Sequence, residues 1–567
     1  MPSASHTIAP VDSSYPATTT RQAALIALGV TALVAALIVL AGLASVMDTK
    51  VWILSVILAL AAGWFVKPAQ RNALVLTLIP ATLLTNSAIV PHSGRYVPAI
   101  TVIGALLIAS RAEWPGLVSR IRALPPALLW LLLAYVAWMG VTTLTSTQRG
   151  TSATYVFGSA VTLGVAFLVI PSLANRSELV RQIVATVAIT GAVIVLSGLV
   201  LALIGSLSIY GGSVGLYFIT EATVLGHPTG LVFLQDYGPF VGPETTPLGL
   251  GLAGSIYLFA TTLSRWRLLW VGTGVIVFLG LLSTFSREGW LIVLIVCGAL
   301  AVFGRRGSPM ARPMIAVALV MLVVFAAGIT NVIGVNGRLD LTAAWYGPNA
   351  SSVLLNPNPG NRGEAQTPGS TSSGGGTPSQ RSLSQPCVAV EASGTSSSTS
   401  VQLKGTSSLF ARLCLWEAAA RAIAHRPLFG FGPGTGTQAI VPYFNGLGAG
   451  LIGATTHDTY LRVGVEMGVP GLLIYLALTG FAVWVAIGCL RARQDRAQNI
   501  LAASILAISV AELTDTLLFG GLSFPGFWLA MSVGLLAVRP AEQGERVLDR
   551  AGAVDLRSSG QTALTGV

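Results

Sequence analysis

The sequence predicts an all-α polytopic membrane protein with about 12–14 transmembrane helices. Its 567 residues are 53% hydrophobic and only 9% charged, and the mean hydropathy is +0.75. The apolar residues fall in runs of about 15 to 25, the length that crosses a hydrocarbon core of roughly 30 Å. Because membrane-spanning segments must satisfy their own backbone hydrogen bonds, this composition excludes a water-soluble core.

Hydropathy divides the chain into a disordered cytoplasmic N-terminus (1–21), a membrane domain with about eleven spans (22–335), an extracytoplasmic loop (336–467), C-terminal spans (468–538) and a cytoplasmic tail (539–567). The first span is too long for a signal peptide and is interpreted as retained. The predicted spans lie near residues 22–46, 51–66, 73–90, 97–110, 126–145, 152–173, 183–209, 248–263, 268–285, 288–304, 313–335, 468–490, 499–519 and 524–538.

The distribution of basic residues predicts the orientation of the spans. If the N-terminus lies in the cytoplasm, the inside loops and both tails hold most of the 32 Lys and Arg residues. This agrees with the positive-inside rule. The net charge of +11 is therefore mainly a signal of topology. The chain has no basic stripe that indicates nucleic-acid binding.

Two outer loops stand out, a Gly/aromatic loop at 210–247 and the long segment 336–467. Residues 349–407 are rich in Ser, Gly, Thr and Pro, a composition that predicts disorder. Residues 408–425 are predicted to form an amphipathic helix on the outer membrane surface, capped by Ser407 or Ser408, and the glycine cluster that follows ends it. Its apolar positions at helical spacing are Leu409, Leu413, Trp416, Ala420 and Ile423.

The four cysteines divide between the spans and the outer segment. Cys297 and Cys489 fall in or at the end of spans and are interpreted as small packing residues. Cys387 and Cys414 lie outside, where disulfides persist, and are predicted to pair; the alternative is two free thiols.

The stretch "THDTYLRVGVEMGVP" places titratable side chains at the edge of an apolar segment. Thr455 or Thr456 is expected to cap a helix that starts at His457, whose imidazole would then stay neutral at the positive helix end. Asp458, Arg462 and Glu466 follow at i, i+4 and i+8, so they form a charge ladder. The ladder could simply be a self-neutralising helical face. His457 could likewise be an interfacial histidine that faces lipid headgroups.

Two arginines on the outer side are candidates for binding an anion. Arg287 lies between two spans, and Arg412 lies on the amphipathic helix. Arg287 could instead pair with Glu288 or snorkel to the interface, and Arg412 could bind lipid headgroups. Together they could hold a diphosphate by bidentate contacts while His457 accepts a proton. No metal-binding pattern is present, which disfavours metal-assisted chemistry and gives no reason to expect a cofactor.

Glu512 and Asp515 are further charged residues in the span near 499–519, at i and i+3. A proton relay, ligands of an acceptor and hydrogen-bonded packing all remain open for them.

Three stretches, "TFSREGW", "RLCLWEAAARAIAHRPLFGFGPGT" and "THDTYLRVGVEMGVPGLLIYLAL", resemble the signatures of the O-antigen ligase and polymerase superfamily, over about residues 240–540. The resemblance implies a C-type glycosyltransferase of the bacterial plasma membrane. Such an enzyme moves a glycan from a polyprenyl diphosphate to a glycan, lipid or protein acceptor on the outer face, without metal or cofactor. By the resemblance, Arg287 and Arg412 match the diphosphate-binding arginines and His457 the catalytic histidine. Asp458 replaces the family's usual asparagine and Glu288 a small residue.

Two other functions compete with a ligase. A polymerase of the same superfamily differs only in the acceptor. A transporter or flippase of lipid-linked sugars would show broken helices and mid-membrane charges in matching halves, and the sequence has no repeat of that kind.

Overall fold

The structure is a computed structural model, and it describes twenty stretches of the chain, which exclude the first 56 residues and the segment 341–407. The described residues are 57–66, 68–84, 99–110, 114, 117–173, 176–204, 207–209, 212–214, 218–224, 227–234, 245–262, 266–284, 286–303, 311–329, 333–340, 408–443, 456, 458–492 with 496–513, and 524–537.

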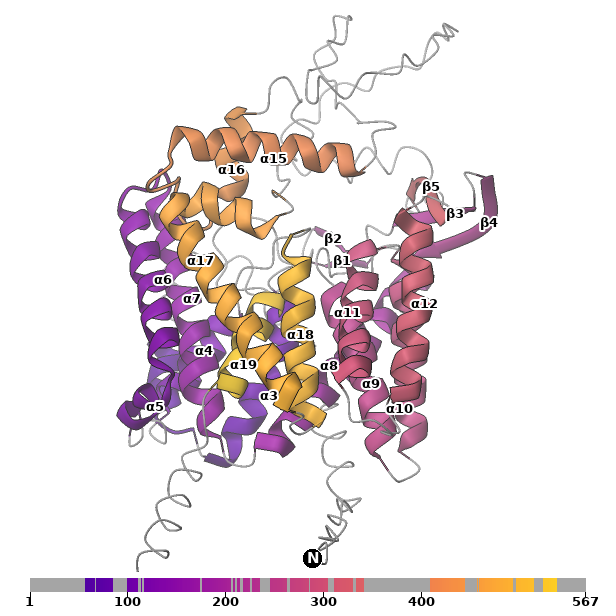
Figure 1. Cartoon of the computed structure of the whole chain (residues 1–567), viewed down its shortest axis with the longest axis horizontal. Helices are drawn as coiled ribbons and strands as arrows, with labels where there is room; N and C mark the ends of the chain where they lie inside the picture. The colour runs from indigo at the N-terminus through magenta and orange to yellow at the C-terminus, as the bar shows by residue number, and fades with distance from the viewer. Residues whose placement is uncertain are drawn as a thin grey trace, which may run out of the picture.

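The helices before the outer segment 336–467 lie on both flanks of a membrane bundle (Figure 1). The helix at Arg149–Gly164 continues through a π-helical turn at Val165–Val169 and a 3-10 turn at Ile170–Ser172. The helices are α3 (Pro68–Leu84), α4 (Ala99–Ile108), α5 (Leu117–Ala123), α6 (Pro126–Leu144), α7 (Arg149–Gly164), α8 (Arg176–Ile204), α9 (Thr245–Thr261), α10 (Arg267–Ser283), α11 (Arg287–Phe303) and α12 (Ala311–Ile329).

Three C-terminal helices complete the bundle: α17 (Thr459–Ala492), α18 (Arg496–Ala511) and α19 (Phe524–Ala537). α17 contains a break at Gly468, whose φ of 68° and ψ of −175° are not helical. The part before the break runs across the end of the bundle, and the part after it descends through the bundle (Figure 1). The break coincides with the residue at which the sequence predicted the span to begin.

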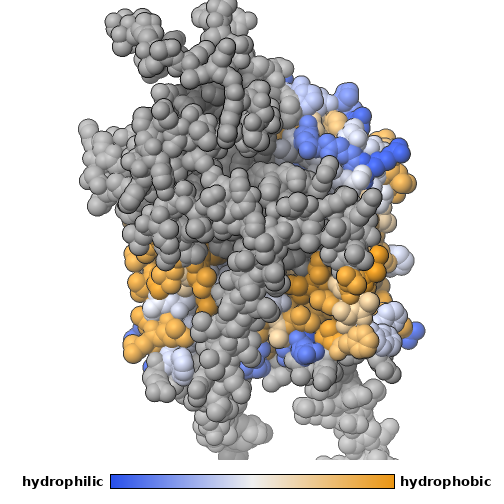
Figure 2. Space-filling model, turned by 180° about the vertical axis from the view of Figure 1, so that it is seen from behind, coloured by the Kyte–Doolittle hydropathy of each residue, from blue (hydrophilic) through white to orange (hydrophobic). Residues whose placement is uncertain are grey.

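The all-α membrane architecture predicted from the sequence is confirmed. Five described helices are long and apolar enough to cross a membrane. They are Pro126–Leu144, Arg149–Ser172, Glu178–Leu196, Ala311–Gly328 and Thr459–Ala492. Three shorter apolar helices are Arg267–Ser283, Ala497–Ala511 and Phe524–Ala537. Hydrophobic residues cover the described surface across the middle of the helices, with hydrophilic residues beyond them (Figure 2). The first predicted span, near 22–46, and the Asp515 end of the thirteenth lie outside the described residues.

Buried apolar side chains from both halves of the chain form one core. Its largest fully buried members include Trp270, Trp528, Tyr475, Phe167 and Phe524. Cys297 and Cys489 are buried in the same core, which confirms their interpretation as packing residues. Cys387 and the side chain of Cys414 lie outside the described part, so their disulfide stays a prediction.

Short strands, which the sequence analysis did not predict, lie in the outer segments. β1 (Leu207–Ile209) pairs antiparallel with β2 (Gly212–Val214). A second antiparallel sheet has the order β4-β3-β5. Its strands are β3 (Phe218–Val224), β4 (His227–Leu234) and β5 (Ile333–Asp340). The Gly/aromatic loop at 210–247 is therefore partly a sheet, because backbone groups outside the helices also need partners.

α15 (Ser408–His425) lies across the end of the bundle where α17 begins (Figure 1). Its bounds are those predicted, but its buried face is different. Leu415, Ala418, Ala419 and Ala422 are buried against Phe431, Ile440 and Val465, whereas Ala420 is exposed. The small residues let α15 pack on protein, on α16 (Gly436–Ile440) and the start of α17, where the sequence analysis expected a membrane surface.

Candidate active site

The sequence-predicted site residues belong to α11, to α15 and to the position just before α17. Arg287 is the first residue of α11 and is exposed. Arg412 lies in α15, although its side chain is outside the described part. His457 is also outside it, but Thr456 and Asp458 on either side are described. The structure therefore gives the backbone positions of α11, α15 and α17, and their side-chain meeting stays a prediction.

The start of α17 differs from the sequence prediction. The helix begins at Thr459, two residues after His457, and Asp458 is its cap. The Asp458 Oδ1 atom accepts a hydrogen bond from the Leu461 backbone N–H at 2.8 Å. Thr456 donates its hydroxyl to the Asp458 carbonyl at 2.8 Å. Asp458 thus replaces Thr455 or Thr456 as the cap because its short carboxylate reaches a free backbone N–H of the first turn.

This correction also changes the argument for His457. A helix that begins at Thr459 does not contain His457 in its first turn, so the electrostatic reason for a neutral imidazole no longer applies in that form. Asp458 is only 9% exposed. Burial raises the pKa of its carboxyl above the ordinary value. Hydrogen bonds from the backbone N–H groups of Leu461 and Tyr460 act in the opposite direction and lower the pKa, but by less.

The Arg462–Glu466 pair predicted by the charge ladder is confirmed. Arg462 donates from Nε to Glu466 Oε1 at 2.7 Å. Asp458 instead caps α17, so the predicted charge ladder consists of one ion pair and not of three interacting side chains. The Glu466 side chain is 2% exposed, and a carboxylate so deeply buried needs hydrogen-bond donors.

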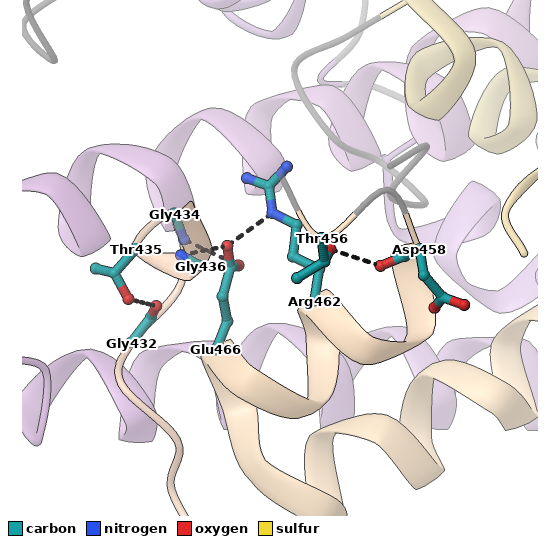
Figure 3. A network of polar contacts seen from close by, with 8 residues as sticks. All are labelled: Gly432, Gly434, Thr435, Gly436, Thr456, Asp458, Arg462 and Glu466. Carbon is teal, nitrogen blue, oxygen red and sulfur yellow. Dashed lines mark hydrogen bonds and ion pairs between the residues drawn. The ribbon is translucent and has the colours of Figure 1, made fainter. Parts of the chain in front are cut away.

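Those donors come from a glycine-rich loop, residues 430–436, that follows α15 (Figure 3). The backbone N–H of Gly434 donates to Glu466 Oε2 and that of Gly436 to Glu466 Oε1, each at 3.0 Å. The Gly432 N–H donates to the Glu466 carbonyl at 2.8 Å. The glycine loop therefore binds an anion, as clusters of backbone N–H groups do, but the anion is a carboxylate of the same chain.

Close approach requires glycine at two positions here. Gly432 has a φ of +107°, and a Cβ there would collide with the Ser146 hydroxyl. Gly468, with its φ of +68°, lies against the Leu428 carbonyl in the same way. Glycine permits both close approaches because it has no Cβ. Beside Gly468, the Val469 N–H donates to the Pro427 carbonyl at 2.7 Å, which links the segment after α15 to α17.

Trp138 of α6 also binds the break in α17. Its indole N–H donates at 2.8 Å to the carbonyl of Met467, the residue directly before the break. The Trp138 ring stacks on Phe429, with ring centroids 5.7 Å apart. The short segment 459–467 is thus fixed at its end by α6 and by the loop after α15.

The same segment is fixed at its start by Glu512. α18 ends at Ala511, earlier than the predicted span, and Glu512 lies in the turn that follows. Its carboxylate accepts hydrogen bonds from the Tyr475 hydroxyl at 2.6 Å and the Tyr460 hydroxyl at 3.1 Å. Its carbonyl accepts the Thr459 N–H at 2.9 Å. Of the interpretations left open for Glu512, hydrogen-bonded packing is what these contacts support.

Sequence reasoning missed most of this arrangement. It treated Glu466 as one member of a neutralising ladder and the glycine cluster only as a helix stop. The available signal was a buried-type segment, "VGVEMGVP", with a single carboxylate between apolar residues, preceded by a loop with several glycines. Such a carboxylate needs donors, and glycine loops provide them. In the described part, no group of three or more His, Cys, Asp and Glu residues could hold a metal ion.

Comparison with known families now adds to this geometry. A model of the O-antigen ligase family matches residues 272–476. These residues belong to the O-antigen ligase family. The matched O-antigen ligase segment runs from α10 into α17 and contains Arg287, Arg412, His457 and Glu466, whereas Glu512 follows it. No curated protein matches the chain.

The family match and the helical bundle together define the class of protein. The chain is a multi-pass membrane protein, and its segment 272–476 is of the O-antigen ligase and polymerase type. Enzymes of this family act on lipid-linked glycans in a membrane.

Proposed function

We propose that this enzyme transfers a glycan from a polyprenyl diphosphate carrier to an acceptor hydroxyl on the outer face of the bacterial plasma membrane. The observation that carries the proposal is the O-antigen ligase match at residues 272–476, which includes all three predicted site residues. The glycine loop and the start of α17 support it, because they fix the backbone directly after His457 from two sides.

In the proposed reaction, His457 accepts the proton of the acceptor hydroxyl. The hydroxyl oxygen attacks the anomeric carbon of the donor sugar, and a new glycosidic bond forms with inversion. The bond from that carbon to the diphosphate oxygen breaks, and its electron pair leaves with the polyprenyl diphosphate. Arg287 and Arg412 hold the developing charge on the diphosphate, and no metal takes part.

The proposed roles separate binding from chemistry, and purified enzyme with lipid-linked glycan tests them. His457→Ala should lower turnover by roughly 10²- to 10⁴-fold, the usual size of general-base catalysis, and leave donor binding intact. Arg287→Lys and Arg412→Ala should weaken donor binding as well as rate, since each loses a bidentate fork. His425→Ala is the matched control, because His425 is exposed on α15 and bonded to Tyr443.

Two results would contradict the proposal. A His457→Ala enzyme with the turnover of His425→Ala would end the general-base role. Arginine variants with unchanged donor affinity would end the diphosphate clamp. Whether the acceptor is a second glycan unit, as in a polymerase, follows from whether the product grows in length or appears on a different molecule.

A further inference from the structure

The two sides of the Arg462 guanidinium have different surroundings. Its Nε atom donates to Glu466, which fixes the plane of the group. Its terminal nitrogens, Nη1 and Nη2, project away from Glu466 (Figure 3). Within the described residues they have no hydrogen-bond acceptor, and the side chain is 21% exposed. Arg462 therefore presents N–H donors in a fixed direction that the described part of the fold does not use.

Tyr155 of α7 lies next to this group. The Tyr155 ring packs on Gly434, where an added Cβ would be 3.2 Å from the ring carbons. Gly434 in turn donates to Glu466, the partner of Arg462. Tyr155 interacts electrostatically with both Arg462 and Glu466, and its hydroxyl has no hydrogen-bond partner in the described part of the chain. A second polar group without a hydrogen-bond partner among the described residues thus lies near the guanidinium.

The surrounding charge decides what kind of ligand these groups suit. Glu466 balances the charge of Arg462, and Asp458 adds another carboxylate one helical turn earlier. This part of α17 consequently has no positive charge to spare, whereas diphosphates are held by groups of cations. A neutral molecule with several hydroxyls needs only donors and acceptors in a fixed arrangement.

We propose that Arg462 and Tyr155 form a subsite for a sugar of the donor glycan. The Nη1 and Nη2 atoms donate to two neighbouring sugar hydroxyls, and the Tyr155 hydroxyl bonds a third. Glu466 is a positioning residue that holds the guanidinium plane. The subsite rests on the proposed function, and it is assigned to the donor because the acceptor need not be a sugar.

Binding of two lipids tests the subsite without requiring turnover. The probes are the lipid-linked glycan extracted from the cells that make the protein, and bare polyprenyl diphosphate. Arg462→Gln should lower affinity for the lipid-linked glycan about tenfold or more, the size of a lost charged hydrogen bond, and leave affinity for the bare carrier within about twofold. Tyr155→Phe should show the same selectivity with about a threefold to tenfold loss.

Arg421→Gln is the matched control. Arg421 also pairs with a glutamate one helical turn away, but on the exposed face of α15, so its affinity for both lipids should be that of the wild type. Tyr155→Phe keeps the ring on Gly434, so it decides the matter if Arg462→Gln fails to fold.

Three results overturn the subsite. An equal loss of affinity for both lipids would place Arg462 on the phosphates. Normal glycan binding by both variants would show that neither residue contacts sugar. A wild-type protein that binds neither lipid would remove the proposed function together with the subsite, whereas the first two results leave that function standing.

Discussion

Two arginine–glutamate pairs with the same one-turn spacing lie on helices that pack against each other. In α17, Arg462 pairs with Glu466, and their side chains are 21% and 2% exposed. In α15, Arg421 pairs with Glu417, and their side chains are 43% and 34% exposed. The two pairs look alike in the sequence. Among the described residues, only the first has further hydrogen-bond partners, the backbone N–H groups of Gly434 and Gly436.

The difference shows that the surroundings of an ion pair, and not its spacing, set its importance. An exposed pair exchanges water for a partner at little gain. A buried carboxylate has lost its water, so each donor that remains is needed. Glu466 joins α15, through the loop after it, to the segment of α17 that follows His457. In the part of the chain that the structure describes, the Arg421–Glu417 pair joins nothing beyond its own helix.

The largest effect is expected for Glu466→Ala. It leaves the Arg462 guanidinium and the N–H groups of Gly434 and Gly436 without their acceptor. Breaking a buried pair in this way costs about 3–5 kcal/mol, so the free energy of unfolding should fall by that amount. Thermal melting of the purified protein in detergent, with turnover of lipid-linked glycan measured beside it, checks the outcome, and turnover should fall as well.

Glu417→Ala is the control for this change, because it removes the same carboxylate from the exposed pair. Equal loss of stability in the two variants would show that burial and the glycine loop do not matter. A double-mutant cycle between Arg462 and Glu466, compared with one between Arg421 and Glu417, would measure the two coupling energies directly.

The contrast also explains how much the sequence could predict. Long apolar runs made the spans visible, since a helix of that length and hydropathy has few alternatives in a membrane. The bounds of α15 were predicted, because its ends carry capping and terminating residues. The buried face of α15 was not, since Leu415, Ala418, Ala419 and Ala422 face protein whose presence no local pattern reveals.

Predictions about the site divide in the same way. The Arg462–Glu466 pair follows from helical spacing and was predicted. The donors from Gly434 and Gly436 come from a loop about 30 residues earlier, and Glu512 comes from the turn after α18. Such contacts depend on tertiary packing, which one sequence does not specify residue by residue.

Glu512→Ala should have the next largest effect. Glu512 is fully buried, and its carboxylate accepts the hydroxyls of Tyr460 and Tyr475. Removing it takes away the acceptor of the buried Tyr475 hydroxyl, whereas the Tyr460 hydroxyl keeps the Ser509 carbonyl at 3.3 Å. A lost buried hydrogen bond of this kind costs about 1–3 kcal/mol. Unfolding should become easier by about 2–3 kcal/mol, as measured by thermal melting.

Glu512→Gln separates the carboxylate from its shape, since an amide oxygen still accepts a hydroxyl. This variant should recover most of the stability lost in Glu512→Ala. If the two variants melt at the same temperature, hydrogen bonding by the Glu512 side chain does not stabilise the start of α17.

Asp458 offers a smaller effect with a defined pH dependence. Asp458→Ala removes the cap of α17 and should cost about 1 kcal/mol, whereas Asp458→Asn keeps a capping oxygen. Burial raises the pKa of Asp458 above 3.8, so the folded state binds the proton more tightly than the unfolded chain. The stability that proton binding by Asp458 contributes is therefore lost as the pH rises from about 3.8 through the raised pKa.

Asp458→Asn removes this titration and should be as stable as the wild type, or more so, at neutral pH. Melting temperatures of both proteins across the acidic range check the sign. A wild type that gains stability relative to Asp458→Asn as the pH rises would mean that the carboxylate is stabilised in the folded state, contrary to its burial.

The smallest effect is expected for Arg421→Ala, at the exposed end of the comparison. Arg421 has water as an alternative partner, and alanine is a better helix former, so the two changes nearly cancel. The free energy of unfolding should change by no more than about 0.5 kcal/mol, and raising the salt concentration should shrink the difference further because exposed charges are screened. Melting at low and high salt measures both effects. A loss as large as that of Glu466→Ala, unchanged by salt, would mean that the α15 pair binds something beyond Glu417, and the two pairs would then no longer differ in kind.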